Sequence, residues 1–347
     1  MKQGKTWIFQ HKPSILSTGV IGGPFEKKSP YSSIFDACKD SLWMEQDSFE
    51  KANRILIEDA VDTVLSKSAV LAEDIDALLM GDLINQITPS SLAARTFSTP
   101  YLGLFSACAT SMEGLALSAA LVDGGYCDNV LTGASSHNAA VEKQFRYPTE
   151  YGGQKPPTAQ WTVTGAGVAL IGRESSQNKA IAHIEKATIG KVLDKGIKDP
   201  FNMGAAMAPA AADVIDRHFR QTNQSPEDFD LIVTGDLAWI GHSITEDLLK
   251  EKGWHFKEEQ FLDCGKLMYL DDPAVQAGAS GPACSAMMIY SHFLKELEKG
   301  SIKKILAVAT GALLSPLTFQ QGESIPCIAH AVELVCADNS SRHGRES

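Results

Sequence analysis

The chain has 347 residues, 44% of them hydrophobic, and a formal net charge of −11 at pH 7. This length suffices for a large core and suggests two domains or one duplicated domain. A chain this acidic, with no run of lysine and arginine, is a poor candidate for binding the phosphate backbone of nucleic acids.

Cysteine spacing and hydropathy argue against a zinc protein, a disulfide-rich protein, a secreted protein and a membrane-spanning protein. The seven cysteines are scattered, and none has the spacing of a zinc site, so we expect no metal and no disulfide framework. The N-terminus lacks the apolar region of a secretory signal, and no apolar run approaches the length of a membrane span. We expect a soluble protein of a reducing compartment, while attachment to a membrane through a partner stays open.

A repeat appears early in the chain. A helical pattern over 55–68 precedes a short apolar run that ends at Gly81-Asp82, and a helix over 210–222 precedes a run that ends at Gly235-Asp236. The aligned segments 73–83 and 227–237 read EDIDALLMGDL and EDFDLIVTGDL, with six identical residues. Apolar runs of this kind are typical of buried parallel strands.

A second pair of blocks follows in the same order. ACATSM (107–112) and ACSAMM (283–288) each begin a helix, which closes at Gly124 and Gly300 respectively, and each helix leads into a strand, 128–134 or 303–312. The pattern predicts an α/β fold of two similar halves, each with a mixed, mainly parallel sheet, related by a pseudo-twofold axis.

The repeat also sets expected boundaries. We place the first half at 1–176 and the second at 177–337, with an insertion at about 242–275 that is polar and aromatic. This insertion fits a cap or an oligomer contact. Residues 338–347 form a polar tail.

Cys108 lies at the expected start of a helix. Free N–H groups and the positive end of the helix dipole lower the pKa of a thiol there, which suits a nucleophile. The alternative is a small buried residue in a tightly packed helix.

The loop after the strand at 128–134 holds a second candidate group. His137 is followed by Arg146 and Tyr147, together with Lys143, Tyr151 and Lys155. Cations alternating with tyrosines suit a small planar anion, because arginine grips a carboxylate and an aromatic ring can stack on the ligand. A solvated polar loop is the alternative. His242, at the start of another helical run, is a weaker candidate.

Asp82 and Asp236 occupy equivalent strand ends in the two halves. They can cap helix N–H groups, hydrogen-bond across the two halves or face a cation. No loop has the spacing of an EF-hand calcium site, and the glycine-rich stretches match no nucleotide-binding motif. No cofactor is therefore expected.

Together these motifs resemble the thiolase and ketoacyl synthase superfamily. The resemblance covers about residues 50 to 335 and is carried by Cys108, by GASG at 278–281 with its Ser280, by TVTGAGVALIGRES at 162–175, and by DPFNMGAAMAPAAADVI at 199–215 with its Met203. It implies a duplicated thiolase-like fold layered α-β-α-β-α.

The catalytic partners of that superfamily are missing at the matching positions. At the position of the ketoacyl synthase histidine, which is Asn-Glu in thiolases, this chain has Gly235 or Asp236. At the position of the thiolase histidine it has Val275, and near the ketoacyl synthase asparagine it has Ala279 or Ser280. Valine can neither move a proton nor donate a hydrogen bond. We therefore expect no catalytic residues.

A narrower resemblance is carried by SSHNAAVEKQFRYPTEYGGQKP (135–156) and TGALLSPLTFQQGESIPCIAH (310–330). Both are similar to the stage V sporulation protein AD family of endospore-forming bacteria. The resemblance implies non-catalytic binding of dipicolinic acid (pyridine-2,6-dicarboxylate), alone or as its calcium complex, for uptake into the developing spore and release at germination. The ligand site expected from it is Cys108, Asp82, His137, Arg146, Tyr147, Asp236, Met203 and Ser280.

The resemblance also implies partners and a location. These are the other SpoVA membrane proteins, peripheral association with the spore inner membrane, and a homodimer, for which we expect the strand DNVLTGA (128–134) and its flanking helix to serve. Two alternatives remain: an acyl-thioester condensing enzyme with rearranged acid and base groups, and a scaffold whose pocket is empty.

Overall fold

The computed structural model describes residues 2–145, 155–270 and 272–337. Its α-helices are α1 (Phe49–Lys67), α2 (Thr88–Ala94), α3 (Thr110–Asp123), α4 (Asn138–Phe145), α5 (Met203–Thr222), α6 (Ala238–Glu251), α7 (Cys264–Leu267), α8 (Pro282–Met288), α9 (Leu294–Lys299) and α10 (Pro316–Gln320). Its strands are β1 (Lys2–Gln3), β2 (Thr6–Ile8), β3 (Ser14–Gly22), β4 (Ala37–Cys38), β5 (Ala77–Gly81), β6 (Tyr101–Gly103), β7 (Asn129–Ser136), β8 (Trp161–Thr162), β9 (Gly165–Gly172), β10 (Ala182–Thr188), β11 (Leu231–Thr234), β12 (Phe261–Asp263), β13 (Ala279–Ser280), β14 (Lys304–Ala312) and β15 (Cys327–Cys336).

The strand order shows the duplication directly. The path through the large sheet is β12-β11-β14-β15-β10-β3-β9-β7-β5-β6, so the order β3-β9-β7-β5-β6 of one half is matched by β10-β15-β14-β11-β12 of the other. In each half one strand, β9 or β15, runs against the other four. The halves meet where β3 pairs antiparallel with β10. The predicted fold class is therefore confirmed.

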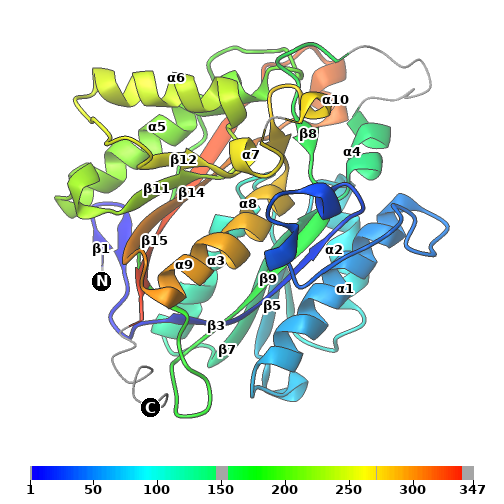
Figure 1. The fold of residues 1–347 in the computed structure, drawn as a ribbon, viewed down its shortest axis with the longest axis vertical. Helices are drawn as coiled ribbons and strands as arrows, with labels where there is room; N and C mark the ends of the chain where they lie inside the picture. The colour runs from blue at the N-terminus through cyan, green and yellow to red at the C-terminus, as the bar shows by residue number, and fades with distance from the viewer. Residues whose placement is uncertain (1, 146–154, 271, 338–347) are drawn as a thin grey trace.

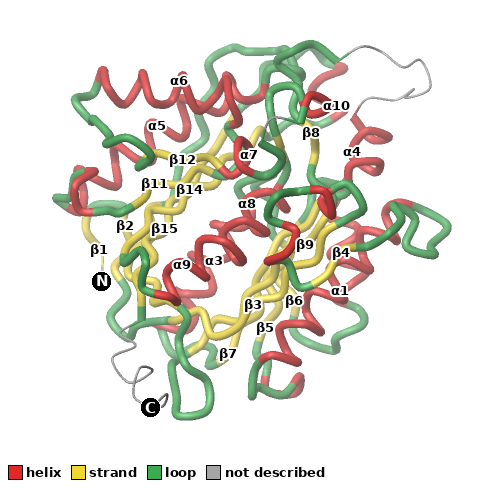
Figure 2. The backbone as a smooth tube through the Cα atoms, viewed as in Figure 1, coloured by secondary structure: helices red, strands yellow, loops and turns green. Residues whose placement is uncertain are grey.

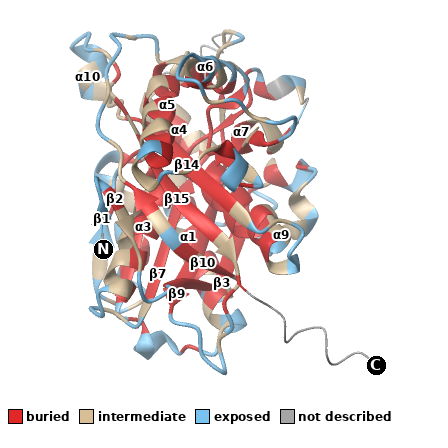
Figure 3. Cartoon of the chain, turned by 90° about the vertical axis from the view of Figure 1, so that its left-hand side faces the viewer, coloured by how far each residue is buried: buried red, intermediate tan, exposed pale blue. Residues whose placement is uncertain are grey.

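The helices form three layers around these strands (Figures 1 and 2). Helix α1 packs on β3, β7 and β9, and α5 packs on β14 and β15, each on the outer face of its half. Helix α3 contacts β5, β7 and β9 on one side and β14 and β15 on the other. Helix α8 packs against α3, β7 and β9, so the central layer is shared by both halves and is buried (Figure 3).

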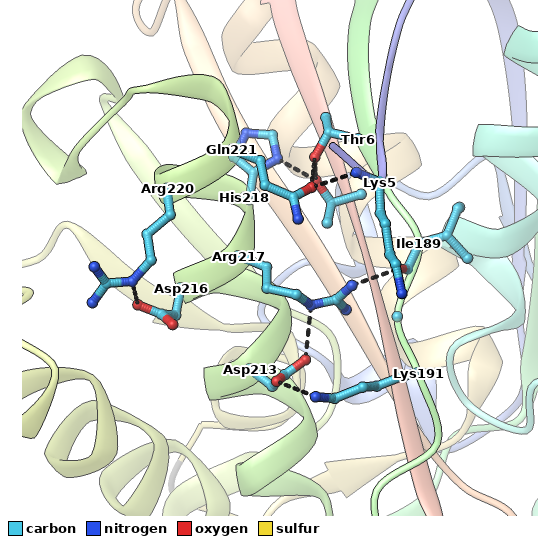
Figure 4. A network of polar contacts seen from close by, with 12 residues as sticks. Lys5, Thr6, Ile189, Lys191, Asp213, Asp216, Arg217, His218, Arg220 and Gln221 are labelled. Atoms are coloured by element: carbon cyan, nitrogen blue, oxygen red, sulfur yellow. Dashed lines mark hydrogen bonds and ion pairs between the residues drawn. The ribbon is translucent and has the colours of Figure 1, made fainter. Parts of the chain in front are cut away.

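The N-terminal strands lie on the second half of the molecule. Strand β2 pairs antiparallel with β10, and the Gln221 side chain of α5 accepts hydrogen bonds from the Lys5 backbone N–H and the Thr6 hydroxyl at 2.9 and 3.1 Å. Thr6 continues the network through Thr188 to His218 (Figure 4). The start of the chain thus fastens α5 to β10, a central strand of the sheet.

One expectation about the dimer is wrong. The strand DNVLTGA corresponds to β7, which is paired with β5 on one side and with β9 on the other. Its backbone donors and acceptors are therefore used within the sheet, and it has no free edge for a partner. Among the described residues the sheet ends at β6 in the first half and at β12 in the second.

The described part of the chain contains no helix that combines the length and the apolar character needed to cross a bilayer.

Candidate functional site

A tight turn after β6 places Cys108 just ahead of α3. Ala107 has a left-handed φ of 49°, which is uncommon for a residue with a Cβ atom. The turn is held by the Thr110 hydroxyl, which donates to the Ala107 carbonyl at 2.7 Å and accepts from the Ser106 N–H at 3.1 Å. A Cβ atom on Gly311 of β14 would come within 2.1 Å of the Ser106 carbonyl oxygen, so the second half presses directly on this turn.

The carboxyl group of Asp236 lies beside Cys108 and gathers donors from several segments. It accepts hydrogen bonds from the Gly281 N–H at 3.0 Å, from the Thr310 hydroxyl at 3.0 Å and from the Ser280 hydroxyl at 3.4 Å. The Cys108 thiol also hydrogen-bonds to it. Because all of these groups are buried, the carboxyl group connects the two halves at the centre of the molecule.

The surroundings keep the Cys108 thiol protonated. Burial first, and then the neighbouring Asp236 carboxyl group, raise the pKa of this thiol well above its ordinary value, although hydrogen bonds from Gly281 and Ser280 act the other way. The expectation that the helix N-terminus lowers this pKa is therefore wrong. The helix field is a modest effect, whereas removing an anion from water costs more. Burial likewise raises the pKa of Asp236 to about 7.

Cys108 lies in the wall of a cavity of about 50 Å³. The described residues that line it are Leu83, Cys108, Val141, Phe145, Gln160, Thr162, Pro200, Phe201, Met203, Ser280 and Leu314. Most are apolar, and none of these described lining residues is lysine or arginine. Gln160 is already engaged, because its amide donates to the carbonyls of Asp236 at 2.6 Å and Ala279 at 3.2 Å.

The structure brings four of the predicted site residues together. Cys108, Met203 and Ser280 line the cavity, and Asp236 lies behind them, bonded to both Cys108 and Ser280. They come from opposite halves of the chain, which is why their proximity rests on the repeat and on the family resemblance rather than on sequence spacing.

Asp82 has a different role from its counterpart Asp236. Its carboxyl oxygens accept from the Ile84 N–H at 2.8 Å and from the N–H and hydroxyl of Ser90 at 2.9 and 2.6 Å, so it caps the turn and helix α2. Burial raises the pKa of Asp82 to about 6. It is not among the described residues that line the cavity, so the structure does not place it beside Cys108.

The two candidate histidines also lie outside the cavity wall as described. The His137 ring contacts the Leu42 carbonyl at 2.8 Å and stacks on Phe49, and burial lowers its pKa. The His242 ring stacks on Phe261 and contacts its carbonyl at 3.0 Å. Both rings are used in packing. Arg146 and Tyr147 lie outside the described residues.

The sequence did not single out His330 or most of the cavity wall. His330 of β15 lies 3.3 Å from the Ser106 hydroxyl, two residues before Cys108, and burial lowers its pKa to about 4, so the ring is neutral. Gln160 and Thr162 precede the glycine-rich strand, and Phe201 precedes Met203. A signal was nevertheless present, because most of these residues lie inside segments that carry the family resemblance: Val141 and Phe145 in 135–156, Thr162 in 162–175, Phe201 in 199–215, and Leu314 and His330 in 310–330. No group of three or more histidine, cysteine, aspartate or glutamate residues in the described part is arranged to hold a metal ion.

Comparisons with known proteins agree with this geometry. The family model described as Stage V sporulation protein AD (SpoVAD) matches residues 3–335. Stage V sporulation protein AD of Bacillus subtilis (strain 168) is 50% identical over 337 residues, which cover 97% of this chain and 98% of that protein.

Three solved structures illustrate the likeness in fold. Cerulenin-bound OleA of Xanthomonas campestris has a TM-score of 0.61 at 14% identity, and the match covers 95% of this chain and 100% of that chain. The 3-oxoacyl-[acyl-carrier-protein] synthase III of Aquifex aeolicus VF5 has 0.58 at 14%, with 93% and 99% covered. Human mitochondrial 3-ketoacyl-CoA thiolase in complex with CoA has 0.56 at 12%, with 95% and 99% covered. At these identities the likeness shows the fold alone.

The protonated thiol leads to a reactivity prediction. At about pH 8, iodoacetamide should modify the half-buried Cys38, Cys127 and Cys336 at least about tenfold faster than Cys108, because alkylation needs a thiolate and access. Peptide mass spectrometry of the native protein measures each rate, with the unfolded chain as the control for equal labelling. Faster labelling of Cys108 than of Cys127 would show that the thiol is activated.

Proposed function

This chain belongs to the stage V sporulation protein AD family, and from that premise we propose that it binds dipicolinic acid without catalysing a reaction. The ligand site of this proposal is the cavity beside Cys108. In this proposal the chain acts with the other SpoVA membrane proteins in the uptake of the ligand into the developing spore and in its release at germination. The chain itself associates peripherally with the inner membrane.

One observation carries the non-catalytic part of the proposal: the Cys108 thiol is paired with a buried carboxyl group. A condensing enzyme needs a thiolate and a group that polarises the thioester carbonyl. Here burial and Asp236 favour the neutral thiol, and Val275 is a buried apolar residue at a position where the resemblance expects a histidine. A pocket whose thiol stays neutral is suited to holding a ligand without reacting with it.

The size of the cavity indicates that its rim moves when the ligand enters. A cavity of roughly 150 Å³ accommodates benzene, whereas this cavity measures about 50 Å³. Pyridine-2,6-dicarboxylate is larger than benzene. The half-buried rings of Phe145 and Phe201 line the cavity, and we propose that their rotation widens it.

The charge of the ligand requires a partner. The described cavity wall offers the Ser280 and Thr162 hydroxyls but no cation, so a bare dianion would enter at high cost. Two arrangements relieve this cost: Arg146, which directly follows Phe145 in the sequence, supplies the positive charge, or the ligand enters as its calcium complex, in which the charges cancel. Titrations with and without Ca²⁺ separate the two.

Binding in the cavity is tested by calorimetry with dipicolinate on the full chain. Cys108→Ser should bind within about twofold of the unmodified protein, because no covalent step is involved. Cys108→Phe, and Met203→Trp at the half-buried rim, should each weaken the tightest binding event at least about tenfold, roughly 1.4 kcal/mol, by filling the space. Circular dichroism confirms folding. If either folded, filled variant binds like the unmodified protein, the ligand does not occupy this cavity.

The absence of condensing chemistry is a separate expectation. Release of CoA from acyl-CoA donors, with and without a second acyl substrate, should not exceed the rate measured for Cys108→Ala, because the thiol remains protonated. Turnover that the unmodified protein shows and Cys108→Ala loses would instead establish the alternative function, an acyl-thioester enzyme.

We also propose a homodimer, now placed at the free edge of β6. This strand ends the sheet among the described residues, and Leu102 within it and Phe105 just after it are 50% and 51% exposed. An exposed edge flanked by apolar side chains is suited to pairing with a second copy.

Light scattering at micromolar concentration tests the dimer. We expect twice the monomer mass for the unmodified chain and a shift towards monomer for Leu102→Lys, since a charge at the edge opposes pairing. Leu71→Lys, at a residue that is 60% exposed and away from β6 in the sequence, is the matched control and should leave the mass unchanged. A monomeric unmodified chain contradicts the proposal.

A further inference from the structure

A second hollow lies on the other face of β8 from the cavity. Its volume is about 330 Å³, and its described lining is Pro24, Phe25, Lys28, Leu42, Asn138, Trp161 and Thr164. These residues come from the turn after β3, the loop after β4, the start of α4 and the region of β8, segments that lie near one another in Figure 1. We call this hollow the aromatic slot.

The aromatic slot is separated from the cavity by a two-stranded sheet. Strand β8 pairs in parallel with β13, with Trp161 opposite Ala279 and Thr162 opposite Ser280. Thr162 and Ser280 line the cavity, whereas Trp161 lines the slot. Alternate residues of a strand point to opposite faces, so the two spaces lie back to back.

Two aromatic rings, tilted against each other, form one wall of the slot. The Phe25 and Trp161 ring centroids lie 4.9 Å apart at 34°, and the buried Tyr269 ring lies 5.0 Å from Phe25. The Tyr269 hydroxyl donates to the Glu26 carboxyl group, which fixes this ring behind Phe25. Phe25 and Trp161 are half-buried, so their outer surfaces remain open to a ligand.

Positive charge surrounds these rings. The Lys28 amino group lies 5.7 Å from the Phe25 centroid, and the Lys155 amino group lies 4.9 Å from the Trp161 centroid. Lys155 also pairs with Glu142 at 2.9 Å, but Lys28 is exposed and has no carboxylate partner among the described residues. No aspartate or glutamate is among the described lining residues, although the chain as a whole is acidic.

We propose that the aromatic slot is a second binding site, outside the cavity, for a planar aromatic carboxylate. A flat ring packs against Phe25 and Trp161, and a carboxylate pairs with Lys28. The lysines already placed over the rings disfavour a cationic ligand. The slot is also roomy enough for a ring, since roughly 150 Å³ accommodates benzene. This inference rests on the proposed function for its choice of ligand, dipicolinate.

The indole N–H of Trp161 supports this assignment. It has no hydrogen-bond partner among the described residues, and buried donors are rarely left unpaired. Because neighbouring atoms cover this nitrogen, a ligand carboxylate in the slot reaches it once the Trp161 ring turns towards the slot. The buried Glu26, which follows Phe25 in the chain, accepts from the Tyr269 hydroxyl and the Thr164 N–H through one carboxyl oxygen, and burial raises its pKa to about 7, which limits its repulsion of an anion.

Fluorine NMR of the full chain, with fluorotryptophan in place of its five tryptophans, gives a readout local to the slot. Trp161→Phe assigns the Trp161 resonance by its loss. Addition of dipicolinate, or of isophthalate, which has the same shape without the ring nitrogen, should move this resonance in a saturable manner. Glutarate carries two carboxylates but no ring and should bind at least about tenfold more weakly.

Matched lysine variants test the role of charge. Lys28→Glu should weaken the ligand response of Trp161 at least about tenfold, because it replaces attraction by repulsion. Lys257→Glu changes the net charge equally at another exposed lysine and should leave the response within about twofold. Cys108→Phe and Met203→Trp, which fill the cavity, should leave the Trp161 response unchanged.

The outcomes separate the slot from the cavity. If calorimetry shows cavity binding but the Trp161 resonance does not move, or if Lys28→Glu and Lys257→Glu behave alike, the slot proposal fails while the proposed function stands. A Trp161 response that Lys28→Glu abolishes, combined with calorimetry that the cavity variants do not change, supports the slot and overturns the cavity as the ligand site.

Discussion

The arrangement around Cys108 depends on one buried carboxyl group. Asp236 accepts hydrogen bonds from Gly281, Thr310 and Ser280 of its own half and from the Cys108 thiol of the other half. A buried carboxyl group is costly unless its oxygens are satisfied, so these donors must stay in place together. The strand ends, the turn at Cys108 and the start of α8 are thereby held in one geometry, and that geometry forms one wall of the cavity.

The aspartates at the equivalent strand ends of the two halves have different roles. In the first half, Asp82 caps the turn that follows its own strand. In the second half, the N–H groups of Leu237 and Ala238 are instead capped by Asp263 at the end of β12, at 2.9 and 2.8 Å. Because Asp263 caps these N–H groups, the Asp236 carboxyl group is available to face Cys108. The same residue type at equivalent positions thus serves helix capping in one half and the central site in the other.

Charge distribution gives the molecule two contrasting hollows. The cavity is narrow and mainly apolar, with the Ser280 hydroxyl and the Cys108 thiol held by Asp236, so it suits a ligand whose charge is already neutralised or is matched from outside the described wall. The aromatic slot is wider and carries lysine beside half-buried rings. Strand β8 contributes consecutive residues to both, so the position of this short strand controls the shape of each. The likeness to condensing enzymes extends to the fold, whereas the groups around the thiol are those of a site that keeps it neutral.

The sequence by itself determined the duplicated α/β fold, because repeated apolar strands ending at Gly-Asp and helices ending at glycine are local patterns. The sequence also predicted that Cys108, Met203, Ser280 and Asp236 share one site, since the repeat and the family resemblance relate positions distant in the chain. Only the tertiary structure decided that the thiol is protonated, that His137 packs on Phe49 and that β7 has no free edge. Burial, strand neighbours and the partner of each donor arise from contacts between segments far apart, for example Thr310 with Asp236 or Trp161 with Phe25. Those contacts set dielectric, charge and available space, and no local pattern of residues encodes them.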